Sequence, residues 1–217
     1  MSQEKGKLAV ISGFSGVGKG TLVQRLIQQY PYDLSVSATT RLPRPGEEPG
    51  VSYFYISREE FEARIEREEF LEWARYVDHY YGTPKPFVME QLAKGKNVIL
   101  EIESEGAFQV KKRYPEAQLI FILPPSMQEL ERRLTERGTE ESQVIRKRLL
   151  KACEEEMPKI EQYDFWVVND DLASCTEELH QLIQTGKTVR PRDPDLPAKL
   201  KAEAAIIFAG NLEQSGV

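Results

Sequence analysis

Short apolar runs alternate along this chain with longer amphipathic stretches. The runs at 8–11, 97–103 and 117–123 are rich in strand-forming residues and have the length of buried strands. After the first run, apolar positions recur at helical spacing from 22 to 27 and predict a helix that ends before Pro31. Such alternation of strands and helices predicts an α/β fold with a mainly parallel central sheet.

The segment from about 34 to 84 departs from this rhythm and is predicted to be an inserted subdomain. Its strands are short and polar with aromatic residues, and Tyr80–Pro84 are expected to form a turn. Glu72 lies between apolar residues of one such strand, where it is either an outward-facing charge or a functional one. Serines three residues before a glutamate predict helix starts after Ser57 and Ser126. The remaining expected strands are 34–40, 51–56, 70–76 and 165–170, and the remaining expected helices are 58–67, 85–94, 107–114, 141–157, 171–184 and 198–209.

The first apolar run leads into a glycine-rich loop, Gly13–Lys19, which is followed by the predicted helix. Strand, glycine-rich loop, lysine and helix in this order are typical of a phosphate-binding P-loop. Glycines let consecutive backbone N–H groups converge on one point, and the helix adds its N-terminal donors and the positive end of its dipole. Lys19 adds a positive charge for the outer phosphates. The alternative is a simple turn with a solvated lysine.

The residue after this lysine departs from the general pattern. A P-loop usually has serine or threonine there to bind Mg²⁺, whereas this chain has Gly20 and places the hydroxyl at Thr21. We therefore expect no direct metal ligand from the protein. Mg²⁺ would be held mainly by nucleotide phosphates and water, which suits the reluctance of this ion to lose its waters.

Further charged residues occur at positions that suit phosphate binding. Arg41 and Arg44 lie in a loop stiffened by prolines, where planar guanidinium groups suit bidentate contacts to phosphate. Glu101 and Glu103 follow the central strand, at the edge where open α/β sheets bind ligands. An arginine-rich helical segment follows residue 130. Two separate cationic regions indicate two phosphorylated ligands, although each group has the ordinary alternative of a solvated surface charge.

Composition narrows the class of protein. The 217-residue chain has a net charge of −6, from 29 basic and 35 acidic residues, and 40% of its residues are hydrophobic. These values are typical of a soluble globular protein and argue against a duplex-binding protein, which usually has a basic excess. Cys153 and Cys175 form no paired motif, so we expect inert thiols in a reducing cytoplasm. The chain shows no apolar signal region and no bilayer-length apolar run, so we expect no membrane partner.

In its ordered motifs the chain resembles the guanylate kinase family over roughly residues 6–186. The matching stretches are GFSGVGKGT, SVSATTRLPRPGE, EFLEW, YYGTP, LEIE, FILPPS, RRLTERGTE and VVNDD. The resemblance implies a P-loop NTPase-type three-layer fold with a central parallel sheet, an inserted GMP-binding subdomain and a helical lid. It implies one domain at 1–187, with a core at 6–33 and 96–187, the insert at about 34–84, the lid at about 133–157, and a C-terminal tail at 188–217.

The resemblance also implies a reaction, reversible Mg²⁺-dependent transfer of the γ-phosphoryl group of ATP to GMP or dGMP, and roles for single residues. The implied ATP-binding residues are Gly13, Phe14, Ser15, Gly16, Val17, Gly18, Lys19, Gly20, Thr21 and Asn169. The implied GMP-binding residues are Ser37, Arg41, Arg44, Tyr53, Glu72, Tyr81, Thr83, Glu101 and Glu103. Those implied to neutralise charge during transfer are Lys19, Arg41, Arg44, Arg133, Arg137 and Arg148. Glu72 would read guanine, because a carboxylate accepts from the adjacent N1–H and N2–H₂ donors of that base.

Two positions depart from the family pattern. Phe14 stands where proline is common, and Ser104–Glu105 stand where a Val–Gln pair is common. Glu105 adds negative charge near the expected site.

Two other functions fit parts of the sequence. Guanylate-kinase-like domains of scaffold proteins serve protein recognition, but this chain keeps Lys19 and the loop glycines. A kinase of another small phosphate ester would not need Glu72, Tyr81 and Thr83, which favour guanine. ATP and GMP are therefore the expected partners, without nucleic acid, and the sequence leaves the oligomeric state open.

Overall fold

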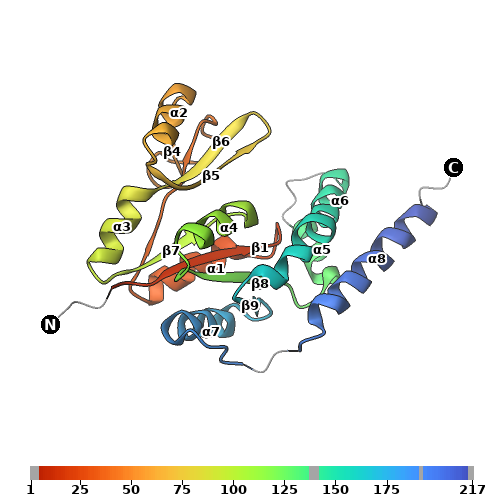
Figure 1. Cartoon of the computed structure of the whole chain (residues 1–217). Coiled ribbons are helices and arrows are strands. Elements are labelled where there is room, and N and C mark those ends of the chain that lie inside the picture. Colours follow the sequence, from red (N-terminus) through yellow and green to blue (C-terminus); the bar gives the residue numbers. More distant parts are fainter. Residues whose placement is uncertain (1–4, 137–141, 191–192, 215–217) are drawn as a thin grey trace. The chain divides into compact units, whose positions relative to one another are not determined.

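The computed structural model of the chain describes residues 5–136, 142–190 and 193–214. Strands and helices alternate along most of this length (Figure 1). The strands are β1 (Leu8–Gly13), β2 (Tyr32–Leu34), β3 (Ala38–Thr39), β4 (Phe54–Tyr55), β5 (Phe70–Tyr76), β6 (His79–Pro84), β7 (Asn97–Glu101), β8 (Gln118–Leu123) and β9 (Phe165–Val168). The helices are α1 (Lys19–Gln29), α2 (Arg58–Glu66), α3 (Lys85–Ala93), α4 (Ser104–Arg113), α5 (Met127–Glu136), α6 (Ser142–Lys151), α7 (Leu172–Thr185) and α8 (Leu196–Gln214), with a π-helical turn (Ala152–Glu156) and a 3-10 helix (Met157–Gln162) after α6.

Five strands form the central sheet, in the order β2-β7-β1-β8-β9. The pairs β1–β7, β2–β7 and β8–β9 run parallel, with Leu8 opposite Val98 and Ile120 opposite Phe165. Every residue of β1 is buried, and so is every residue of β8 after Gln118. Parallel strands are covered on both faces, which is why these runs are continuously apolar. The predicted α/β fold with a central parallel sheet is confirmed.

Contacts divide the chain into two compact units. One contains the described residues up to Ser12 together with Val23–Leu119, and the other contains Gly13–Leu22 together with the described residues from Ile120 onward. These two units do not coincide with the core, insert, lid and tail inferred from the sequence, and the boundaries of those four parts stay predictions. Within the described parts of the chain, no helix is both long and apolar enough to cross a membrane.

The first unit contains a second, four-stranded sheet in the order β4-β3-β6-β5. Helix α2 packs on this sheet (Figure 1), where the ring of Phe61 stacks on Phe70 with centroids 4.3 Å apart and on Tyr80 at 5.2 Å. The Oγ atom of Ser57 accepts a hydrogen bond of 3.1 Å from the backbone N–H of Glu60, which confirms the predicted start of α2. These aromatic residues form a small core separate from the apolar strands of the parallel sheet.

Two local predictions in this unit are wrong. The expected strand at 34–40 is divided between two sheets, because the N–H of Ser35 bonds to the carbonyl of Ile99 beside β7 whereas β3 pairs with β6. The expected turn at 80–84 is strand β6, which pairs antiparallel with β5. The connecting turn lies earlier, at Val77, whose φ of 56° is left-handed. Pairing with β5 decided the conformation of this aromatic segment.

The second unit contains the helices that follow β8. The helix expected at 141–157 is α-helical only to Lys151 and then continues as the π-helical turn and the 3-10 helix. Pro158 lies at the start of the 3-10 helix, and proline has no N–H for an α-helical hydrogen bond. Helix α7 is capped by Asp171, whose side chain accepts a 2.9 Å hydrogen bond from the N–H of Ser174.

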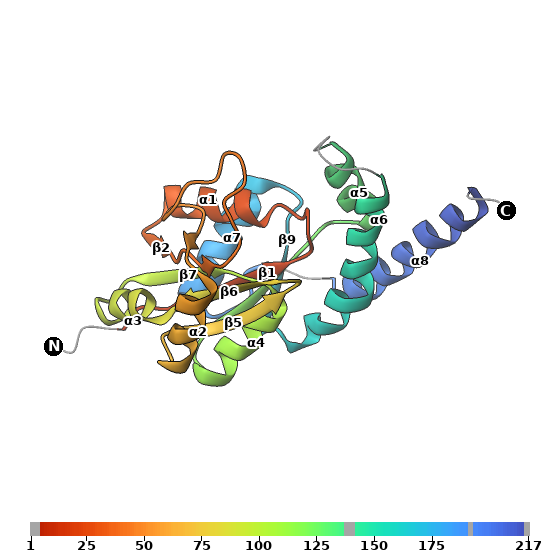
Figure 2. The same cartoon turned by 90° about the horizontal axis from the view of Figure 1, so that it is seen from above.

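Helix α8 is longer than the predicted 198–209 and contacts α5 (Figure 2). Leu200 and Ala204, four residues apart, are buried on one face of α8. Between them, the Oε2 atom of Glu203 accepts a 2.8 Å hydrogen bond from the backbone N–H of Met127, the first residue of α5. The C-terminal tail therefore supplies a cap for α5, whose own Ser126 caps only the N–H of Glu129.

This contact predicts that Glu203→Ala lowers the stability of the protein. Losing a helix cap costs about 1 kcal/mol of unfolding free energy, which in a chain of this size lowers Tm by roughly 2–4 °C. Lys201→Ala, at an exposed position of the same helix, is the matched control and should leave Tm unchanged. Thermal unfolding followed by circular dichroism measures both. Equal Tm values for the two variants would show that Glu203 does not cap α5.

Candidate active site

The glycine-rich loop after β1 presents its backbone rather than its side chains. Gly16 and Gly18 have φ values of 90° and 96°, which favour glycine. A β-carbon at Gly16 would lie 2.5 Å from Cδ2 of Leu134, and one at Gly18 would lie 2.7 Å from Nδ2 of Asn169. The positive φ therefore favours glycine at both positions, and a β-carbon at either would also displace a neighbouring side chain. The loop has the backbone that a phosphate cradle needs.

Two loop residues expected to bind ATP have buried side chains. Phe14 is fully buried, and its ring meets that of Phe121 edge-on with centroids 5.3 Å apart. Val17 is also fully buried. Any contact of these residues with a nucleotide would come from their backbone. The phenylalanine that departs from the family pattern thus serves as a core residue.

Lys19 is the first residue of α1 and lies against the loop. Its ammonium group donates hydrogen bonds to the backbone carbonyls of Gly13, at 2.6 Å, and of Phe14, at 3.2 Å. These carbonyls hold the positive charge beside the backbone donors of the loop. Gly20 and Thr21 follow in the first turn of α1 and are exposed.

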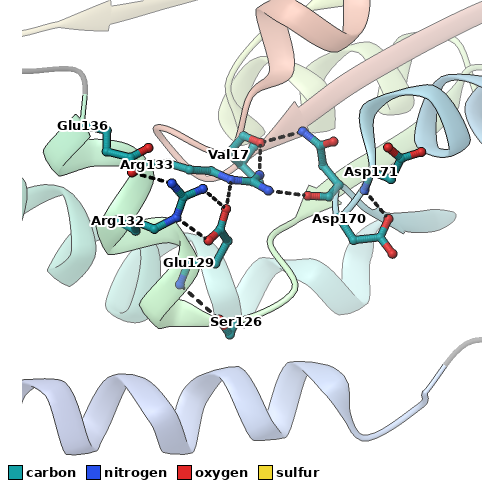
Figure 3. A network of polar contacts seen from close by, with 9 residues as sticks. Val17, Ser126, Glu129, Arg132, Arg133, Glu136, Asp170 and Asp171 are labelled. Atoms are coloured by element: carbon teal, nitrogen blue, oxygen red, sulfur yellow. Dashed lines mark hydrogen bonds and ion pairs between the residues drawn. The ribbon is translucent and has the colours of Figure 1, made fainter.

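Arg133 of α5 is clamped between three groups (Figure 3). It donates to a carboxylate oxygen of Glu129 at 2.7 Å, to the carbonyl of Val17 at 3.1 Å and to the carbonyl of Asn169 at 2.9 Å. The side-chain amide of Asn169 donates to the same carbonyl of Val17 at 2.9 Å. Hydrogen bonds from Arg132 and Arg133 lower the pKa of Glu129 to about 2, so this carboxylate is charged at neutral pH. The expected lid arginine and the expected adenosine-side asparagine are thus joined to the P-loop in one network.

Two further arginines were expected beside Arg133. Arg148 of α6 donates a 2.8 Å hydrogen bond to the hydroxyl of Ser15 in the loop. Arg137 lies outside the residues that the structure describes. The described residues that are expected to contact ATP all belong to the second unit.

In the first unit, Glu47 organises the loop that carries Arg41 and Arg44. Arg41 donates to both carboxylate oxygens of Glu47, at 2.9 and 2.8 Å. The backbone N–H of Arg44 and the hydroxyl of Tyr55 each donate to the same carboxylate at 2.8 Å. These hydrogen bonds, above all those of Arg41, lower the pKa of Glu47 to about 2. Arg41 is thus oriented by a charged partner, whereas the side chain of Arg44 is exposed.

Aromatic residues line the same loop. The guanidinium carbon of Arg41 lies 5.5 Å from the ring centroid of Tyr53, a cation–π distance. The Tyr53 ring in turn meets that of Tyr81 with centroids 6.0 Å apart. Burial raises the pKa of the Tyr53 phenol. The backbone carbonyl of Ser37 accepts a 2.9 Å hydrogen bond from the N–H of Phe54, so Ser37 lies beside the strand that follows Tyr53.

Glu72 of β5 is a buried carboxylate. It is only 4% exposed, and its Oε1 atom accepts a 2.6 Å hydrogen bond from the hydroxyl of Thr83 on the paired strand β6. Burial raises the pKa of Glu72 to about 7, although the hydrogen bond from Thr83 opposes this change. The outward-facing alternative for Glu72 is excluded. A buried carboxylate with unused acceptor capacity is suited to receive N–H donors from a ligand.

The predicted acidic pair lies after β7. Glu101 ends this strand and Glu103 is the N-cap residue of α4. The charge of Glu101 reaches Tyr53, where it adds a small upward contribution to the pKa of the phenol. Among the described residues, no group of three or more acidic, histidine or cysteine side chains is arranged to hold a metal ion.

Sequence analysis missed the residues that hold the functional groups in place. Glu47 and Glu129 orient Arg41 and Arg133, and both lie within four to six residues of their partners. Opposite charges at such spacing are a usable signal on a helix, as for Glu129. Gly106 also escaped notice: a β-carbon there would lie 2.4 Å from Oε2 of Glu72. No local pattern could reveal that approach, since the two residues belong to different elements.

Comparison with known proteins places this geometry in a family. The guanylate kinase family profile matches residues 5–186. The chain is 47% identical over 203 residues to the guanylate kinase of Caldanaerobacter subterraneus subsp. tengcongensis, covering 93% of this chain and 98% of that protein. It is 51% identical over 180 residues to the guanylate kinase of Synechocystis sp., covering 82% and 94%. The crystal structure of guanylate kinase from Anaplasma phagocytophilum superposes with a TM-score of 0.69 at 28% identity, covering 93% of this chain and 97% of that one. By profile, sequence and fold, the chain belongs to the guanylate kinase family.

Proposed function

We propose that this chain transfers the γ-phosphoryl group of ATP reversibly to GMP or dGMP, forming ADP and the corresponding guanosine diphosphate. The observation that carries the proposal is the buried carboxylate of Glu72, in a chain whose other unit contains a P-loop with its lysine. Guanine offers N1–H and N2–H₂ as adjacent donors, whereas adenine does not, so a carboxylate selects guanine. Thr83 holds this carboxylate and supplies a hydroxyl beside the base.

The GMP phosphate would bind on the insert, at about 34–84. Arg41 and Arg44 would donate to its oxygens, with hydroxyls from Ser37, Tyr53 and Tyr81. Arg41 is paired with Glu47, so phosphate binding would exchange or share that partner. Arg44 is exposed and ready to add a second charge. Glu101 and Glu103 would lie near GMP and the metal.

ATP phosphates would bind to the backbone of the loop, Gly13–Thr21, and to Lys19. Arg133 and Arg148 already contact the loop, so they would lie close to these phosphates. Together with Arg137 they would form the arginine cluster of a lid at about 133–157. Asn169 would contact the adenosine side. No covalent nucleophile is needed, because phosphoryl transfer depends mainly on positioning and charge stabilisation.

The residues of the chain fit Mg²⁺ as an ion carried by the nucleotide. In the part of the chain that the structure describes, no group of three or more acidic, histidine or cysteine side chains could hold a metal ion. Nucleotide phosphates and water would therefore supply the oxygen ligands that this ion prefers. When bound, the ion would neutralise phosphate charge.

A cytoplasmic location without nucleic-acid or membrane partners fits these substrates. Cys153 and Cys175 are free thiols. Burial raises the pKa of the first to about 11 and of the second to about 12. Both therefore remain unreactive thiols at neutral pH, as is common in a reducing compartment.

The proposal is tested by a coupled ADP-release assay with ATP and Mg²⁺ that compares GMP, AMP, CMP and UMP. We expect turnover with GMP and little with the others. We also expect Lys19→Ala to lower kcat/KM by roughly 100-fold or more, because it removes a positive charge that stabilises the phosphoryl group during transfer. Lys112→Ala, an exposed lysine of α4, is the matched control and should keep full activity. Folded wild-type protein that binds GMP without turnover would point instead to a recognition module.

Glu72→Gln should impair recognition of guanine specifically. Glutamine keeps one acceptor but turns an NH₂ group toward the N–H donors of the base, so KM for GMP should rise by roughly 10- to 100-fold, the value of a charged hydrogen bond. KM for ATP should not change. Glu66→Gln, an exposed acid of α2, controls for loss of charge. An unchanged ratio of kcat/KM for GMP over IMP, which lacks the 2-amino group, would refute the role of Glu72.

Activity toward GMP should also depend on pH through Glu72. In the free protein its pKa is about 7, so below that pH the carboxylate gains a proton and loses an acceptor. We expect kcat/KM for GMP to fall by about tenfold per pH unit on this limb. The second pKa of the GMP phosphate is about 6, so its protonation adds a limb of its own to the pH profile. The profile of Glu72→Gln should retain only this phosphate limb. Identical profiles for the two proteins would count against this assignment.

The raised pKa of Glu72 should also make the stability of the folded protein depend on pH. The unfolded chain releases the proton of Glu72 near its ordinary pKa of 4.5, whereas the folded chain releases it near 7. Between these values the folded state binds more protons, so stability should fall as pH rises from 4.5 to 7. Thermal unfolding of the wild type relative to Glu72→Gln measures this difference.

A further inference from the structure

The strand that carries Glu72 lies at an edge of its sheet. In the order β4-β3-β6-β5, strand β5 pairs with β6 alone among the described strands, and its register is interrupted between Phe70 and Glu72. An edge strand leaves a row of backbone N–H and C=O groups without ladder partners. Its pairing with β6 alone is therefore a weak constraint on the position of the Glu72 carboxylate.

Helix α4 covers this open edge (Figures 1 and 2). The side-chain amide of Gln109 donates to the carbonyl of Trp73 at 2.9 Å and accepts from the N–H of Trp73 at 3.3 Å. It thus replaces both hydrogen bonds that a neighbouring strand would make to one residue. Arg113 donates to the carbonyls of Phe70 and Leu71, at 3.0 and 2.8 Å. The residues on both sides of Glu72 are therefore fixed to α4.

Gly106 lies on the same face of α4, three and seven residues before these two side chains. It is buried, and a β-carbon there would lie 2.4 Å from Oε2 and 2.9 Å from Cδ of Glu72. Since ordinary contacts are about 3.5 Å or longer, an alanine would push the carboxylate back by roughly 1 Å. The backbone of the first turn of α4 thus forms the wall against which Oε2 rests, while Thr83 holds Oε1.

We propose that Gly106, Gln109 and Arg113 form a positioning face that sets the depth and orientation of the Glu72 carboxylate, and hence the selection of guanine. The inference rests on the proposed function, in which Glu72 reads the base. These three residues do not contact the base themselves. They act through Glu72, by fixing its strand on one side and limiting its side chain on the other.

The test is the ratio of kcat/KM for GMP over IMP, measured with full-length Gly106→Ala. A misplacement of this size should reduce the ratio by roughly 10- to 100-fold, mainly through KM for GMP, with KM for ATP unchanged. Alanine is a better helix former than glycine, so helix propensity opposes unfolding. Lys112→Ala, exposed on the same helix, is the matched control and should keep the wild-type ratio.

Rescue separates positioning from general damage. Aspartate at position 72 is one methylene shorter and leaves room for the new β-carbon. Glu72→Asp combined with Gly106→Ala should therefore discriminate GMP from IMP better than Gly106→Ala alone. Gln109→Leu, which keeps the bulk but removes both hydrogen bonds to Trp73, should reduce the ratio by about 3- to 10-fold. This second variant carries the test if Gly106→Ala fails to fold.

The possible failures are distinguishable. If Glu72→Gln reduces the ratio but Gly106→Ala and Gln109→Leu both keep it, the positioning face is refuted and the function stands. If Glu72→Gln itself keeps the ratio, guanine reading by Glu72 is refuted and this inference falls with it. If Gly106→Ala and Gln109→Leu change KM for GMP and KM for ATP equally, and Glu72→Asp gives no rescue, these residues have only a structural role.

Discussion

Burial of the Glu72 carboxylate is the constraint around which the first unit is arranged. A carboxylate out of water is costly unless its lone pairs are satisfied. Thr83 satisfies one oxygen, and the absence of a side chain at Gly106 lets the backbone of α4 approach the other. Burial still dominates, because the pKa of Glu72 is raised to about 7. The site therefore contains an incompletely satisfied acceptor, and a base with two adjacent N–H donors would complete it.

In each unit, one arginine of the candidate site is held by a carboxylate. Arg41 is paired with Glu47, and Arg133 with Glu129. Hydrogen bonds from the arginines lower the pKa of each carboxylate to about 2, so both pairs are charged over the whole neutral range. Pairing orients a flexible guanidinium before a ligand arrives, which reduces the entropy lost on binding. It also makes phosphate binding an exchange of partners rather than the neutralisation of a free charge.

The C-terminal tail has a structural role outside the segment that the family profile matches. The match ends at residue 186, whereas α8 begins at Leu196. Through Glu203 this helix caps the first turn of α5, the helix that carries Glu129 and Arg133. A hydrogen bond from outside the segment that the family profile matches thus caps the helix that carries Arg133.

Local chemistry was enough to predict much of this protein. The strand–loop–lysine–helix order, the helix starts after Ser57 and Ser126 and the apolar central strands all follow from rules that act within a few residues. Sequence alone therefore determined them and the fold class. The ordered motifs also identified the family, which the profile match confirms. The assigned roles of individual residues stay predictions.

Tertiary structure decided the remainder. It made Tyr80–Pro84 a strand, because β5 was available as a partner. It buried Glu72 against Gly106, and it chose Glu47 as the partner of Arg41. Such outcomes depend on which segments meet in space, and the residues concerned carry no local mark of their partners. The sequence alone therefore indicates which residues are candidates for function. Only packing between distant elements determines which partners orient their side chains.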